Sequence, residues 1–145
     1  MLTDRGTMLT DYEIRAHQFF ETRIFALAKA GKEDFLEKLE RKPKSHERLR
    51  LILGTVEKVS ARGLSACIGA GNFVRLLDGS LGLAEVKVSG KAIRVMCYCQ
   101  TGKEELLVLL FDFDGHKGKS GAIAPDIMDK GRKLARIAGE LAGKE

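Results

Sequence analysis

Two cationic side chains lie at a spacing that would bring them together across a tight turn. Lys87 and Arg94 flank the run Ser89-Gly90-Lys91, in which Gly90-Lys91 has the composition of a two-residue hairpin turn. With that turn, Lys87 would face Arg94 on one side of an antiparallel pair of strands. Two cations placed this way repel each other unless an anion sits between them. The pair is therefore a candidate phosphate-binding site; the alternative interpretation is that both charges only keep an open sheet face soluble.

A basic loop supplies the second group of candidate residues. Residues 114–121 follow the last predicted strand and hold His116, Lys117 and Lys119. Histidine exchanges protons near neutral pH, and neighbouring lysines favour an anionic ligand. His116 is thus a candidate proton donor at a phosphate, with the alternative that it is only an exposed loop residue.

The other reactive residue types indicate structure. Cys67, Cys97 and Cys99 contain no Cys-x-x-Cys pair, and we expect reduced, buried thiols in a cytoplasmic protein. The opposite face of the predicted hairpin is apolar and would pack under helices: Val86, Val88, Ile93, Val95, Cys97 and Cys99. Asp112 and Asp114 alternate with phenylalanines; a shared metal ion is conceivable, but a polar strand end is the favoured interpretation. We therefore predict no metal and no cofactor.

Apolar residues at helical spacing predict the helices that would hold these strands in place. The predicted helices are 32–41, 45–63 and 125–141. Pro43 separates the first two, because proline cannot continue a helix. Residues 11–30 fit either a helix or a strand, and the strand alternative covers 22–28.

The middle of the chain has the period of two that is typical of strands. The predicted strands are 73–77, 81–88, 92–100 and 106–113, separated by short polar turns such as Asp78-Gly79. This pattern predicts an antiparallel meander. The expected fold class is α+β: a small antiparallel sheet of about four strands, with helices packed on one face, namely two N-terminal helices and a C-terminal helix. Residues 1–10 are expected to be a disordered leader or tag, and 11–145 a single domain.

The charge of the chain is concentrated in its middle. The 145 residues carry a net charge of +5, with 44% hydrophobic and 31% charged residues. Residues 41–100 hold 11 basic and 4 acidic side chains, a net charge of +7. A localised basic surface suits a polyanion, because neutralising phosphates releases condensed counterions; a solvated lysine-rich face is the alternative. No apolar run approaches the roughly 20 residues of a membrane span.

The order of these motifs resembles the RelE/HigB-like toxin superfamily, in particular its phage-derived branch. The resemblance covers about residues 22–140 and assigns 22–28 as the first strand. It depends on the helix Glu33-Asp34-Phe35-Leu36-Glu37-Lys38-Leu39 before Pro43, and on three strand motifs: Leu76-Leu77-Asp78-Gly79, Glu85-Val86-Lys87 and Ile93-Arg94-Val95-Met96-Cys97-Tyr98.

The resemblance implies the toxin of a type II toxin–antitoxin system, a ribosome-associated endoribonuclease. It would cleave mRNA without a metal, by attack of a ribose 2′-hydroxyl on the adjacent phosphate. Lys87 and Arg94 correspond to the family's cationic pair, Lys117 and Lys119 to its basic loop, and His116 would move a proton. The implied partners are mRNA on the ribosome and a helix-turn-helix antitoxin, with no membrane.

The alternative to this activity is a non-catalytic, phage-encoded module of the RelE fold that binds nucleic acid or protein. It is motivated by the C-terminal part, where no tyrosine follows Tyr98, and by Lys87, which stands where the family has arginine. A third hypothesis is an interaction protein whose positive charge only serves solubility.

Overall fold

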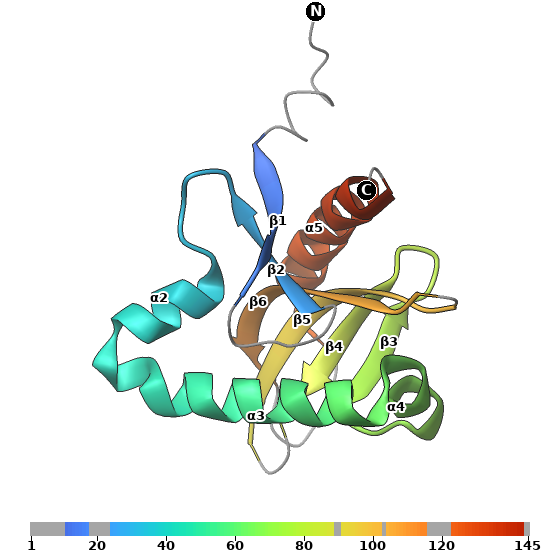
Figure 1. Cartoon of the computed structure of the whole chain (residues 1–145), viewed down its shortest axis with the longest axis horizontal. Coiled ribbons are helices and arrows are strands. Elements are labelled where there is room, and N and C mark those ends of the chain that lie inside the picture. The colour runs from blue at the N-terminus through green and yellow to red at the C-terminus, as the bar shows by residue number, and fades with distance from the viewer. Residues whose placement is uncertain (1–10, 18–23, 89–90, 103, 116–122, 144–145) are drawn as a thin grey trace, which may run out of the picture.

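A single mixed sheet forms the centre of the computed structural model, which describes residues 11–17, 24–88, 91–102, 104–115 and 123–143 (Figure 1). The strands in these ranges are β1 (Tyr12–Ala16), β2 (Ile24–Lys29), β3 (Val74–Asp78), β4 (Leu83–Lys87), β5 (Ile93–Gln100) and β6 (Leu106–Asp114). They lie in the order β1-β2-β6-β5-β4-β3. β2 is parallel to β6, and every other neighbouring pair is antiparallel.

The prediction of a small antiparallel sheet of about four strands is wrong, because the described residues form a six-stranded mixed sheet. The meander β3–β6 is present, but β2 adds to β6 in parallel, and β1 pairs with β2. β2 is buried on both faces: Ile24 and Ala26 pack on one side of the sheet and Leu27 on the other. A strand buried on both faces reads as a continuous apolar run without alternation, which made 11–30 ambiguous between helix and strand.

The described residues form four α-helices, and the first of them begins at a local side-chain cap. They are α2 (Phe35–Arg41), α3 (His46–Arg62), α4 (Leu64–Ala70) and α5 (Pro125–Gly143), with a 3₁₀ turn at Pro43–Ser45. Asp34 caps α2: its carboxylate accepts from the Glu37 amide at 2.9 Å, and the Glu37 carboxylate accepts from the Asp34 amide at 3.0 Å. This reciprocal pair satisfies two amides that the first turn would otherwise leave open, so α2 begins at Phe35.

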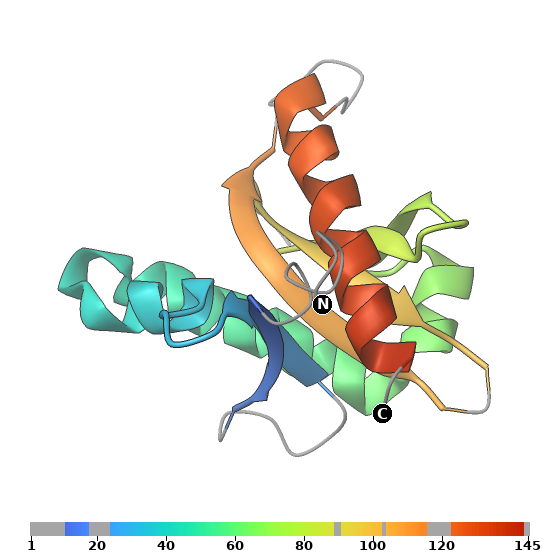
Figure 2. The ribbon, with the colours of Figure 1, turned by 90° about the horizontal axis from the view of Figure 1, so that it is seen from above.

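Helices cover both faces of the sheet, and the expectation that the helices pack on one face is wrong for α5. One apolar core lies between the sheet and α2–α4; the other lies between the sheet and α5 (Figure 2). β6 requires both layers, because Leu107 and Leu109 belong to the first core and Val108 and Leu110 to the second. None of the described helices is both long and apolar enough to cross a membrane.

Candidate anion-binding site

The predicted cross-strand pair is present in the sheet. Lys87 of β4 is the register partner of Arg94 of β5. The face opposite the pair is the apolar one that the sequence predicts, and its members are all buried in the core under α2–α4: Val86, Val88, Ile93, Val95, Cys97 and Cys99. The predicted register and the predicted division of the two faces are therefore confirmed.

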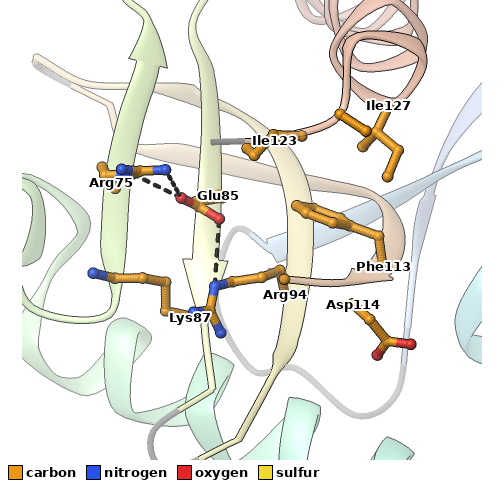
Figure 3. Close-up of a pocket in the computed structure, with 10 residues that line it drawn as sticks. Arg75, Glu85, Lys87, Arg94, Phe113, Asp114, Ile123 and Ile127 are labelled. Carbon is orange, nitrogen blue, oxygen red and sulfur yellow. Dashed lines mark hydrogen bonds and ion pairs between the residues drawn. The ribbon is translucent and has the colours of Figure 1, made fainter. Parts of the chain in front are cut away.

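A pocket with one charged wall and one apolar wall surrounds this pair. The cavity measures about 170 Å³ and is bordered by Arg75, Lys87 and Arg94 on the strands (Figure 3). Its other wall contains Phe113 at the end of β6 and Ile127 in the first turn of α5. The start of α5 therefore covers part of the cationic face of the sheet, so the site is concave and not the open sheet face of the alternative interpretation.

A buried carboxylate lies between the arginines of this pocket. Glu85 is 2% exposed, and its Oε2 accepts from Arg75 Nε at 2.7 Å. Arg75 Nη2 approaches the same oxygen at 2.5 Å, whereas Arg94 Nε lies 3.6 Å from Oε1. Figure 3 shows Glu85 between the two guanidinium groups. A buried carboxylate needs such partners, because an uncompensated charge in a protein interior is costly.

The guanidinium of Arg94 is fixed from its own hairpin. Nη1 donates to the carbonyl oxygens of Lys91 at 3.0 Å and Ile93 at 3.1 Å. Gly115 lies against the group, since a Cβ added at this glycine would be 3.2 Å from Arg94 Cζ. Within the described part of the chain, Nη2 has no hydrogen bond. Arg94 is therefore fixed through Nη1, and its Nη2 remains available to donate to a ligand in the pocket.

Lys87 contributes the second available cation. It is half-buried, and the described residues offer its ammonium group no hydrogen bond or ion pair. Three cations therefore line the pocket, together with the carboxylates of Glu85 and Asp114. A carboxylate or phosphate group entering the cavity would gain charge-assisted hydrogen bonds from Arg94 and Lys87.

Asp114 also borders the pocket, but its carboxylate is bound elsewhere. Arg48 of α3 donates through Nε to Asp112 at 2.7 Å and through Nη1 to Asp114 at 2.9 Å. Partial burial acts to lower the pKa of Arg48, but the hydrogen bonds to Asp112 and Asp114 outweigh it and raise that pKa. Asp112 and Asp114 thus bind Arg48 at the polar end of β6. The described residues contain no cluster of three potential metal ligands.

His116, Lys117 and Lys119 lie outside the described residues. The described residues that flank their segment, Gly115 and Ile123, both line the pocket. The predicted roles of these three side chains therefore stay predictions.

The cysteines are packing residues, as predicted. Cys67, Cys97 and Cys99 are free and buried. Burial raises the pKa of the Cys97 thiol well above its ordinary value and that of Cys99 to about 11. Thiols of this kind stay protonated at neutral pH and are poor nucleophiles.

Sequence reasoning missed Glu85 and Arg75 as members of the site. A signal for Glu85 was present, because residues two apart on a strand share a face and Glu85 must lie on the same side as Lys87. Arg75 carries no such signal, since its partnership with Glu85 depends on the register between β3 and β4.

Comparisons with known proteins do not add a relative. No family model matches the chain, and neither the curated proteins nor the solved structures contain a match. The function must therefore be argued from the site itself.

Proposed function

We propose that this protein is an RNA-cleaving toxin of the RelE/HigB-like type, with Lys87 and Arg94 at the scissile phosphate. One observation carries the proposal: the two cations are register partners in a pocket and keep uncommitted donors there. The six-stranded sheet is not part of the support. The substrate would be mRNA on the ribosome, in the cytoplasm, and a helix-turn-helix antitoxin would neutralise the toxin.

The proposed chemistry needs charge stabilisation and proton transfer. The ribose 2′-hydroxyl attacks the adjacent phosphorus, and negative charge grows on the phosphorane oxygens as the bond to the 5′-oxygen breaks. Arg94 Nη2 and the Lys87 ammonium group are the donors that would meet this charge. His116, beside Lys117 and Lys119, is the proposed proton carrier, on the resemblance alone. DNA lacks the 2′-hydroxyl, so it would bind without being cut.

An Arg94→Ala variant tests the proposal. Purified protein would be given ribosome-bound message, and the cleavage rate measured against the variant. We expect a loss of about 100-fold or more, the typical cost of removing one donor to a developing oxyanion. Arg41→Ala is the matched control, because Arg41 pairs only with Glu33 among the described residues, far from the pocket lining. Cleavage that survives in Arg94→Ala, or intact message with the wild-type protein, would contradict the proposal.

A second candidate function is binding of nucleic acid without cleavage. It is favoured by the described part of the pocket, which contains no histidine and whose carboxylates are both held by arginines, Glu85 by Arg75 and Asp114 by Arg48. In that case single-stranded RNA would bind and stay intact. Lys87→Gln would then remove one phosphate contact, and the plot of log affinity against log salt would become less steep by about 0.7. An unchanged slope would remove Lys87 from the interface.

A further inference from the structure

We propose that Arg75 is a positioning residue that keeps the anion pocket cationic by holding Glu85, so that Arg94 stays available to the ligand. The identity of the ligand as an RNA phosphate rests on the proposed function. The positioning itself concerns only anion binding.

The two arginines share Glu85 unequally. Arg75 is the register partner of Glu85 on the edge strand β3, and two of its nitrogens meet one carboxylate oxygen, at 2.7 and 2.5 Å. The Arg94 contact to the other oxygen is 3.6 Å, which is longer than a hydrogen bond. Glu85 is therefore committed to Arg75, and Arg94 is only near it.

The burial of Glu85 makes this division consequential. At 2% exposure the carboxylate has little contact with water, so the loss of its partner favours compensation by another cation. Arg94 is already within ion-pair distance, and Lys87 follows two positions along on the same face of β4. Without Arg75, Glu85 would draw one or both of them into hydrogen bonds. The same two cations would then no longer be free for an incoming anion.

A direct role is the competing explanation for Arg75. Its side chain is 48% exposed and borders the cavity, so it is itself within reach of the pocket. Both roles predict weaker anion binding in Arg75→Ala. They differ when Glu85 is neutralised at the same time: a positioning residue becomes dispensable once there is no carboxylate to hold, whereas a ligand contact stays missing.

The test is a double-mutant cycle on binding. Arginine side-chain NMR signals would be followed at low salt during titration with inorganic phosphate, and then with a 2′-O-methylated RNA oligonucleotide that cannot be cleaved. The proteins are the wild type, Arg75→Ala, Glu85→Gln, the double variant, and Arg41→Ala as control. We expect Arg75→Ala to bind about tenfold more weakly, as typical coupling energies between contacting residues imply. Glu85→Gln should bind at least as tightly as the wild type, and the double variant within about threefold of Glu85→Gln.

Each departure from this pattern overturns the inference. A double variant as weak as Arg75→Ala would make Arg75 a ligand contact, and an Arg75→Ala variant with wild-type affinity would give it no role. If Arg75→Ala fails to fold, Glu85→Gln and the double variant still decide, because neither leaves a buried charge unpaired. A wild type that binds no phosphate overturns the inference together with the pocket. A wild type that binds phosphate but cuts no message contradicts only the proposed function.

Discussion

Two charged clusters at the same end of the sheet have opposite compositions. On the face under α5, one carboxylate, Glu85, lies between Arg75 and Arg94. On the face under α3, one arginine, Arg48, lies between Asp112 and Asp114. Each cluster joins separate elements, β3–β4–β5 in the first and α3–β6 in the second. They differ in which charge is in excess, although Asp114 of the second cluster borders the same cavity as the first.

The difference shows that similar ion pairs can have different roles, structural in one cluster and ligand-binding in the other. Arg48 donates through Nε and Nη1 to the two aspartates, and the excess negative charge lies on Asp114, whose side chain is 74% exposed. In the Glu85 cluster the excess is positive and borders a cavity of about 170 Å³. The first arrangement ties a helix to a strand. The second arrangement leaves cationic groups that can bind an anionic ligand.

Reversing the charge of the buried carboxylate should have the largest effect. Glu85→Lys would place a cation among three others at a position that is only 2% exposed. We expect the free energy of unfolding to fall by about 4 kcal/mol, the range found when a buried ion pair loses one partner. Urea denaturation measures it. The matched reversal in the other cluster, Asp112→Lys, should cost less, because the Asp112 side chain is 20% exposed. Equal losses for the two reversals would erase the distinction between the clusters.

Removing the central arginine of the second cluster should have a smaller effect, on stability alone. Arg48→Ala breaks two charge-assisted hydrogen bonds, but its aspartates can be partly hydrated, so we expect a loss of about 1–2 kcal/mol. Phosphate binding, followed by NMR, should be unchanged. Arg50→Ala is the control: it removes an exposed pair with Glu47, so it should change stability less than Arg48→Ala does. Weakened phosphate binding in Arg48→Ala would make Arg48 part of the anion site.

Neutralising Glu105, whose carboxylate is bound by the N-terminus of α4, should have the smallest effect on stability. The size of this effect should depend on pH. Hydrogen bonds from Ser65, and from the Leu64 amide, lower the pKa of Glu105 below its ordinary value. Because the folded pKa is the lower one, its stabilisation is present above the unfolded value of about 4.3 and is lost as pH falls through the folded pKa. Glu105→Gln should therefore lower stability by about 0.5–1 kcal/mol at neutral pH and by less near pH 3. Thermal unfolding against pH measures this difference, and a difference independent of pH would contradict the role.

The parts of the fold that were predicted correctly depend on local information. The β4–β5 register follows from a short turn and from the period of two, which together decide that Lys87 and Arg94 share a face and that Val86 and Val95 face the core. Helix α2 is likewise local, since its cap lies within four residues, Asp34 to Glu37.

The parts that were missed depend on partners distant in the chain. α4 was not predicted because its first amides are capped by Glu105, about 40 residues away. The parallel pairing of β2 with β6 joins Ile24 to Leu107, and no turn between them records it. Glu85 appeared as one residue of a strand motif, and its burial required α5 to cover the sheet.

The amino-acid sequence by itself determined the alternation of β4 and β5, the turn that sets Lys87 opposite Arg94, and the excess of positive charge in the middle of the chain. Only the tertiary structure decided that α5 covers the sheet face of Lys87 and Arg94, that Arg75 pairs with Glu85, and that Arg48 binds both aspartates. The physical reason is range: dihedral preferences and side-chain period act between neighbours in the chain. Burial and ion pairing depend instead on which distant elements pack together.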